Sequence, residues 1–131
     1  MVSALTAATA MADPVDRTHL ERLATRFGSH FLLQIIDLFI AQGRDRIAAA
    51  EHGIATGDVA AIVTAAHALK SSAGNLGAAP LGKCAAEIER RGIAGASLDV
   101  LAPMVPALGD AFEAACTALA AARADVERRS A

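Results

Sequence analysis

Residues 59–78 read VAAIVTAAHALKSSAGNLGA, and this stretch predicts a long helix with one apolar face and one bare polar face. Five apolar positions recur at the spacing of a single helical stripe and are predicted to face a core: Ile62, Ala66, Leu69, Ala73 and Leu76. His67, Lys70, Ser71 and Gly74 follow the spacing i, i+3, i+4 and i+7, so they share the other face. That face carries an imidazole, one cation and two small residues, and it lacks any bulky side chain that would keep another protein away.

An exposed histidine on such a face is suited to nucleophilic chemistry. The ordinary pKa of an imidazole lies near neutrality, so a solvent-facing ring is substantially neutral at pH 7 and can attack an electrophile. A phosphoryl group is the natural target, because a phosphoramidate on imidazole is itself reactive and can pass its phosphoryl group to a carboxylate. Lys70, one turn away, would offset the added negative charge. On these residues alone, Lys70 could equally be an ordinary solvated helix residue.

The residues around His67 also depart from the chain's general usage. The protein has ten arginines and only two lysines, and both lysines, Lys70 and Lys83, lie within residues 59–86, which contain no Asp or Glu. Gly74 stands inside the predicted helix, where glycine costs about 1 kcal/mol relative to alanine. Close approach of a partner's backbone would explain this glycine. Relief of packing near the helix end is the other explanation, and the sequence does not decide between them.

The remaining sequence predicts an all-α fold. The chain has 131 residues, is rich in alanine and shows no strand pattern, which favours a single helical domain. Helices are predicted over about 16–26, 30–54, 59–76 and 80–92, followed by a last helix from near Ser97 to about Arg128. Short turns between long helices imply antiparallel neighbours. We therefore expect an up-down antiparallel four-helix bundle with a short additional N-terminal helix.

The ends of these helices carry recognisable signals. Ser29 and Asp58 are predicted to be N-caps, and Gly28 and Gly77 are predicted helix stops. Two further glycines are expected to break the fourth helix, and two prolines are expected to kink the last helix or delay its start: Gly92, Gly95, Pro103 and Pro106.

The motif AHALKSSAGNLGA, residues 66–78, resembles the signature of histidine-containing phosphotransfer (Hpt) domains, which reads roughly HxLKGSSxxLGA. The matching positions are His67, Leu69, Lys70, Ser72, Leu76, Gly77 and Ala78. The flanking segments FGSHFLLQIIDLFIAQGRDRI (27–47) and PALGDAFEAACTAL (106–119) also resemble family sequences, so the resemblance covers roughly residues 15–122. Ser71 is a departure, because the family usually has glycine there; its hydroxyl could contact the phosphoryl group or narrow the choice of partner.

The resemblance implies a function in a multistep two-component phosphorelay. His67 would accept a phosphoryl group from the aspartate of a receiver domain and pass it to another receiver, while Lys70 stabilises the added charge. Ser71 and Gly74 would leave the face clear for docking. The receiver, with its Mg²⁺, would supply most of the catalysis, so the chain would be a phosphotransfer intermediate that binds no cofactor and has no ATP site of its own.

A docking surface is predicted beside His67. Residues 31–40 carry more apolar side chains than one core-facing stripe can absorb, so some of Ile35, Leu38, Phe39 and Gln42 would remain exposed for a receiver. The other reading is that all of them are buried under the N-terminal helix.

Composition limits the other possibilities. The formal net charge is −2 and the pI about 6.0, so no basic field indicates a nucleic-acid partner. The fully apolar runs are shorter than a membrane span, and residues 1–14 lack the basic start of a signal peptide, so we expect a disordered tail before a domain at 15–128. Cys84 and Cys116 look like core residues of a reducing compartment, which predicts a cytoplasmic location. A monomer is the expectation from the family.

Two further hypotheses remain beside the phosphorelay. One is a non-catalytic scaffold bundle of the same fold, in which His67 would be dispensable. The other is a metal or haem bundle, which the histidine spacing disfavours, since four residues show no i, i+3 or i, i+4 pairing: His19, His30, His52 and His67. No glycine-rich nucleotide loop indicates a kinase, and no GxSxG motif indicates a hydrolase.

Overall fold

The computed structural model describes residues 13–130, and in this range its secondary-structure elements are all helices joined by short turns, with no strand. The elements are α2 (Arg17–Phe27), α3 (Ser29–Thr56), α4 (Val59–Leu76), α5 (Ala79–Ile93), the single turn α6 (Leu98–Leu101), the 3₁₀ turn η1 (Ala102–Met104) and α7 (Val105–Ser130). The all-α prediction is confirmed. The tail expected at 1–14 lies almost wholly outside the described residues.

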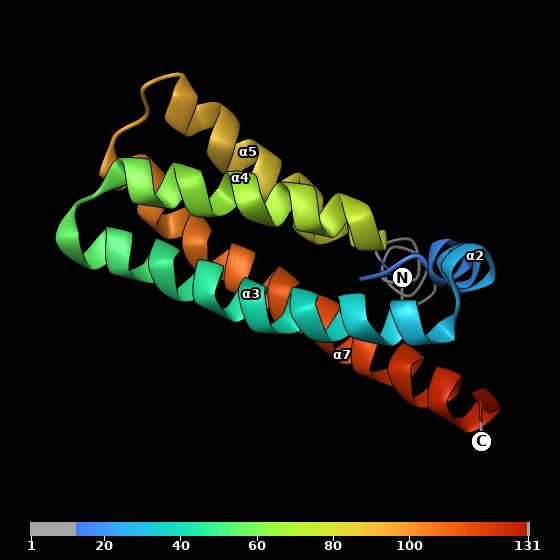
Figure 1. Cartoon of the computed structure of the whole chain (residues 1–131). Coiled ribbons are helices and arrows are strands. Elements are labelled where there is room, and N and C mark those ends of the chain that lie inside the picture. The colour runs from blue at the N-terminus through green and yellow to red at the C-terminus, as the bar shows by residue number, and fades with distance from the viewer. Residues whose placement is uncertain (1–12, 131) are drawn as a thin grey trace, which may run out of the picture.

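Four long helices enclose the core. Helix α3 contacts α4 and α7, and α5 contacts the same two helices from the other side. Successive long helices run in opposite directions, and α2 lies across one end of the group, where it packs on α3 (Figure 1). The apolar stripe predicted for residues 59–76 is buried between α3 and α5, which leaves the opposite face of α4 open to solvent.

Close helix packing depends on small residues at specific positions. A Cβ atom added at Gly43 of α3 would overlap the ring of Phe112 on α7, and one added at Gly92 of α5 would overlap the side chain of Val63 on α4. Phe112 is fully buried, and its ring centroid lies 5.7 Å from that of Phe39. These glycines therefore fix how closely α3 approaches α7 and α5 approaches α4.

Several predicted helix ends are confirmed. The Asp58 side chain accepts a hydrogen bond from the Ala61 amide at 3.1 Å, as an N-cap does. Gly77 ends α4 with φ +70°, and Gly57 ends α3 with φ +71°, both in the left-handed region where glycine is strain-free.

One predicted end is wrong, and two are confirmed in part. Ser29 is the first helical residue rather than an N-cap; Gly28 takes the cap position and provides no side chain. Of the two glycines expected to break the fourth helix, Gly92 lies inside α5, where close packing requires a glycine, whereas the chain turns at Gly95 as predicted. A single helical turn, α6, begins after Ser97 as predicted, but Pro103 sits in the 3₁₀ turn η1 and Pro106 in the first turn of α7. The prolines therefore delay the long helix, which is one of the two effects expected of them.

The segment Leu98–Arg129 is long and apolar enough, by composition, to cross a membrane. In the structure its largest apolar side chains, among them Leu108, Phe112 and Leu119, are fully buried against the other helices, whereas Val100 is exposed. This segment therefore supplies part of the core of the bundle.

Helix α2 is tied to the C-terminal end of α4. The Asp16 amide donates to the Gly77 carbonyl oxygen at 2.9 Å, and Nε2 of His19 lies 2.9 Å from the Asn75 carbonyl oxygen. Asp16 also caps α2 by accepting from the His19 amide at 3.2 Å. These bonds place α2 next to the open face of α4.

Candidate functional site

His67 lies at the middle of α4 on its solvent-facing side, with 63% of its side chain exposed. Lys70, Ser71 and Gly74 lie on the same side, as their spacing predicts; the Lys70 side chain is 41% exposed, and Ser71 and Gly74 are exposed. A Cβ atom added at Gly74 would meet no atom within 4 Å. Packing inside the protein therefore does not require this glycine, which removes one of its two explanations.

A carboxylate from the neighbouring helix completes the site. Glu89 of α5 hydrogen-bonds through Oε2 to Nδ1 of His67 and through Oε1 to Nζ of Lys70. Its side chain is only 11% exposed, so the carboxylate sits in the contact between α4 and α5 while the imidazole above it stays accessible. One carboxylate thus links the two residues that the sequence singles out.

The pKa of Glu89 determines which ring nitrogen of His67 is free. The hydrogen bond from the Lys70 ammonium, and next that from His67, hold this pKa below its usual range and outweigh the effect of burial. The carboxylate is therefore ionised at neutral pH and can only accept hydrogen bonds, so Nδ1 of His67 must carry the proton. In the neutral ring, Nε2 then bears the lone pair, on the side away from Glu89.

Sequence reasoning missed Glu89. The segment 59–86, which holds both lysines, contains no acid, but Glu89 lies just beyond its end and pairs with Lys70. A signal was present in α5. Glu89 stands four residues after Ala85 and eight after Leu81, which are both buried, so it continues the apolar stripe as a charged residue. A charge in that position indicates a partner on a facing helix.

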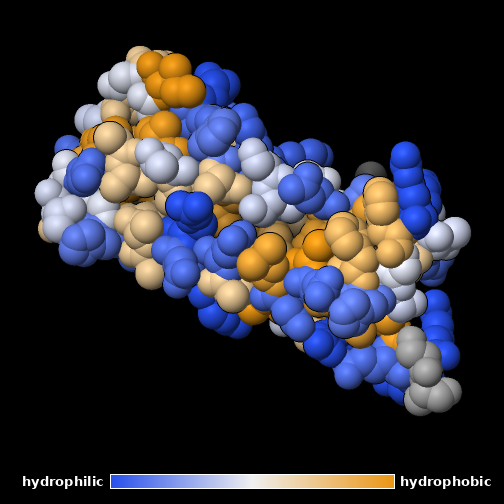
Figure 2. Space-filling model, in the orientation of Figure 1, coloured by the Kyte–Doolittle hydropathy of each residue, from blue (hydrophilic) through white to orange (hydrophobic). Residues whose placement is uncertain are grey.

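An apolar groove lies on the other side of the α4 face, between α2, α3 and α4. It is lined by Leu23, Phe27, Phe31, Ile35, Leu38, Phe39, Gln42, Ser72, Asn75 and Leu76. Figure 2 shows hydrophobic side chains gathered over this region. Three of the chain's four phenylalanines line it, and the rings of Phe27 and Phe31 lie 5.1 Å apart at its end.

The structure brings together most of the predicted docking residues. Leu38 is 54% exposed and Gln42 is exposed, so α2 does not cover the whole set. Ile35 is half-buried in the groove wall. Phe39 differs from the expectation: it is 4% exposed and packs on Phe112, so it forms the floor of the groove rather than part of its accessible surface. Phe27 was not predicted, because its exposure depends on where α2 docks.

Among residues 13–130, no cluster of three or more His, Cys, Asp or Glu side chains could hold a metal ion.

Comparison with known proteins agrees with this geometry. Residues 34–122 match the family profile described as the Hpt domain. No curated protein sequence matches the chain. Among solved structures, histidine-containing phosphotransfer protein B from Pseudomonas aeruginosa superposes with a TM-score of 0.79 at 20% identity, covering 87% of this chain and 97% of that one. The Hpt domain of a sensor hybrid histidine kinase from Shewanella superposes with a TM-score of 0.75 at 14% identity and the same coverage. The family profile covers more than half of the chain, and the chain therefore belongs to the Hpt domain family.

Proposed function

We propose that this protein carries phosphoryl groups on His67 in a multistep two-component phosphorelay, receiving each group from a receiver-domain aspartate and passing it to a second receiver. Membership of the Hpt family supports the phosphotransfer function itself. The observation that supports His67 as the acceptor is its hydrogen bond to Glu89, which leaves Nε2 of an exposed ring with a free lone pair.

The transfer needs no proton to move at the reacting nitrogen. The Nε2 lone pair attacks the phosphorus of the aspartyl phosphate, the N–P bond forms, and the P–O bond to the aspartate breaks with its electron pair left on the carboxylate. Nδ1 keeps its proton throughout, so the ring becomes positively charged as the phosphoryl group arrives. Reversing the same steps hands the group to the next receiver.

Glu89 and Lys70 match the two charges that this step creates. The ionised carboxylate of Glu89 lies against Nδ1, where the ring charge develops, and acts as a positioning residue that holds the ring in the reactive tautomer. The ammonium of Lys70 rests on Glu89 before transfer and lies one turn from His67, within reach of the phosphoryl oxygens. Before transfer, the ion pair between Lys70 and Glu89 therefore holds both charged groups beside His67.

The partner in this proposal is a receiver domain of a response regulator or hybrid kinase. It would dock over His67, with Ser71 and Gly74 beneath it and Ile35, Leu38 and Gln42 in the groove above Phe39. Such a contact would be small and quickly released. Mg²⁺ would reside on the receiver, and ATP would be used only by the upstream kinase.

The remaining features of the proposal concern the chain's organisation and setting. We place it in the cytoplasm as a monomer that binds neither nucleic acid nor membrane, and the free thiols of Cys84 and Cys116 are consistent with a reducing compartment. The fold that presents the site is proposed to be the up-down antiparallel four-helix bundle, with α2 as the additional short N-terminal helix.

A transfer assay tests this function. Receiver domains carrying radiolabelled phospho-aspartate are mixed with the protein, and labelled bands are then treated with acid and base. Label on the protein that is lost in acid and kept in base identifies phosphohistidine and supports the proposal. A folded protein that takes no label from a panel of several receivers would support the scaffold hypothesis instead.

Replacing Glu89 by glutamine tests its role as a positioning residue. Glutamine can still accept from Nδ1 but carries no charge, so the rate of transfer is expected to fall by at least about tenfold, because the charge that develops on the ring is no longer matched. Alanine at the same position should have a larger effect, because it also frees the tautomer. Transfer rates under single-turnover conditions measure both variants.

Nitrogen NMR of the His67 ring provides a readout that a purely structural role would not change. In the wild type at neutral pH, Nδ1 should be the protonated nitrogen; Glu89→Gln should keep this tautomer and Glu89→Ala should lose it. Equal transfer rates for wild type and both variants would show that Glu89 only joins the two helices.

Replacing Gly74 by leucine tests whether a partner must approach α4 closely. The new side chain would project into open space, so folding should change little, while transfer from a receiver should fall at least tenfold because docking is blocked. Gly109→Leu in α7 is the matched control, since a Cβ there also meets nothing within 4 Å but lies away from the site. If both variants accept the phosphoryl group at the wild-type rate, the receiver does not cover Gly74.

A further inference from the structure

A shallow depression adjoins the site on the side of α5, opposite to the apolar groove. Its lining consists of two lysines and seven small residues: Lys70, Ala73, Gly74, Gly77, Ala78, Ala79, Gly82, Lys83 and Ala86. Lys70 belongs both to this depression and to the cluster with His67 and Glu89. A receiver seated over His67 would therefore border directly on it.

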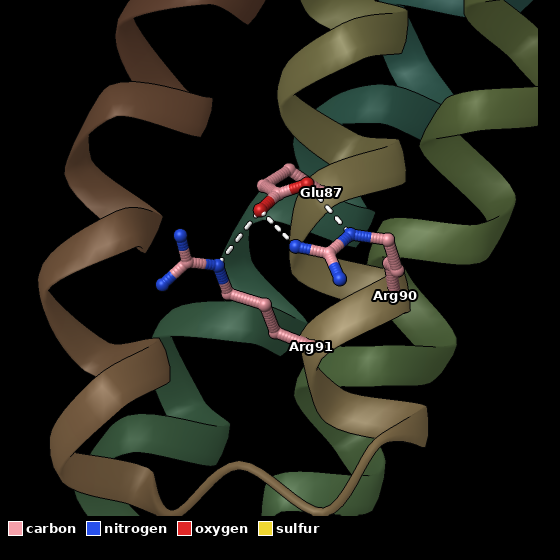
Figure 3. A network of polar contacts seen from close by, with 3 residues as sticks. All are labelled: Glu87, Arg90 and Arg91. Atoms are coloured by element: carbon pink, nitrogen blue, oxygen red, sulfur yellow. Dashed lines mark hydrogen bonds and ion pairs between the residues drawn. The ribbon is translucent and has the colours of Figure 1, made fainter.

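The charges on α4 and α5 leave one cation without a partner. These two helices carry four basic and two acidic side chains, although the chain as a whole has a net charge of −2. Lys70 is paired with Glu89. Arg90 and Arg91 both bind Glu87 (Figure 3), and their hydrogen bonds lower the pKa of Glu87 to about 2.

Lys83 is the remaining cation of the pair of helices. It is exposed, and within residues 13–130 it makes neither an ion pair nor a side-chain hydrogen bond. It stands on the rim of the depression, so its ammonium group is available to a molecule that rests there. Both carboxylates on these helices, Glu87 and Glu89, are already engaged, so neither competes with a partner for Lys83.

The depression is shallow but open because small side chains form its floor. Gly43 and Gly92 are needed for close packing, whereas a Cβ at Gly82 would make only an ordinary 3.5 Å contact with Ala73, and one at Gly74 would meet nothing. Neither of these helix-interior glycines is required by the fold. Because Gly74 and Gly82 carry no side chains, a partner's surface can approach the helices closely enough for the Lys83 ammonium group to contact it.

We propose that Lys83 is a specificity-determining residue for phosphotransfer, pairing with a carboxylate on the docked receiver at the α5 edge of the interface. The occupant of the depression is thus the same receiver that contacts His67, and the inference rests on the proposed function. Receivers that carry an acidic side chain at this edge are accepted, and receivers with a basic side chain there are repelled.

Replacing Lys83 should change the binding of the receiver rather than the phosphoryl-transfer step. The structure gives it no hydrogen bond or ion pair with His67, Lys70 or Glu89, which bind one another, so it does not act on the reacting atoms. A charge at the rim of an interface mainly changes the rate of association and its dependence on salt. The rate of transfer inside the complex should therefore be independent of this residue.

The test compares two donors for each variant. The protein donor is the phosphorylated receiver domain that labels the wild type fastest in a panel, and the small-molecule donor is phosphoramidate, which reaches His67 without docking. The variants are Lys83→Gln and Lys83→Glu, with Arg129→Glu as the control that makes the same charge reversal in α7, in the groove beside α2. Initial rates are measured over a range of receiver and salt concentrations.

For Lys83→Glu we expect the KM for the receiver to rise about tenfold at low salt, with kcat within twofold of wild type. Lys83→Gln should show a smaller rise and a weaker salt dependence than the wild type. Phosphoramidate should label all variants equally, and Arg129→Glu should behave as the wild type with both donors.

Other outcomes separate this inference from the proposed function. If the receiver transfers to the wild type, and Lys83→Glu has the same KM at every salt concentration, Lys83 does not contact the receiver while the phosphotransfer function stands. A fall in kcat without a rise in KM would also overturn the inference. If neither donor labels the wild type, the proposed function itself fails.

Discussion

Replacing His67 by glutamine is expected to abolish phosphoryl labelling from every donor and to leave the fold unchanged. Glutamine offers no ring nitrogen with a nucleophilic lone pair, so no N–P bond can form at this position. The imidazole is 63% exposed and contributes little to the core, so the free energy of unfolding should change by no more than about 1 kcal/mol. Lys70 still pairs with Glu89, so the carboxylate is not left buried alone.

Labelling and circular dichroism measure the two halves of this expectation. Mass spectrometry of the labelled wild type should place the phosphoryl group on the peptide that contains His67. The other histidines serve as internal controls, since His19 is engaged with the Asn75 carbonyl and the hydrogen bonds of Glu89 go to His67 and Lys70. Acid-labile label that persists on a folded His67→Gln variant would assign the acceptor to another residue.

The sequence was sufficient for α4 and its exposed face because both depend on local information. The apolar stripe, the Asp58 cap and the Gly77 stop all lie within or next to the helix, and they determine its bounds and the direction of His67. These features need no knowledge of how the helices meet. Exposure of Leu38, by contrast, was one of two readings that the sequence left open, because the N-terminal helix could have covered the surplus apolar residues of α3.

Glu89 and Phe27 could not be placed in the same way. Glu89 follows His67 by 22 residues, and the two side chains meet only because α5 lies close against α4. That closeness depends on Gly92 facing Val63, and in the sequence Gly92 reads as a helix break. Phe27 reaches the groove because Asp16 ties α2 to the end of α4 through Gly77. The positions of Glu89 and Phe27 are thus determined by contacts between helices, which the pattern within one helix does not reveal.

The variant Gly43→Ala tests whether the close packing of α3 against α7 requires a glycine at this position. The added Cβ would overlap the ring of Phe112, which is fully buried and packed on Phe39, so the ring or the two helices must shift. Overpacking of this kind is expected to lower the free energy of unfolding by about 2–3 kcal/mol, even though alanine is the better helix former. Urea unfolding followed by circular dichroism measures the loss.

Gly74→Ala is the matched control, because it makes the same change in a helix interior without any overlap. It should raise the free energy of unfolding by about 1 kcal/mol, the intrinsic preference for alanine. Opposite signs in the two variants would show that Gly43 serves the packing of the core, whereas Gly74 is kept against the helix's own preference. If both variants gain the same free energy of unfolding, α3 and α7 can move apart without cost. In that case the contact with Phe112 does not determine where Phe39 lies at the floor of the groove.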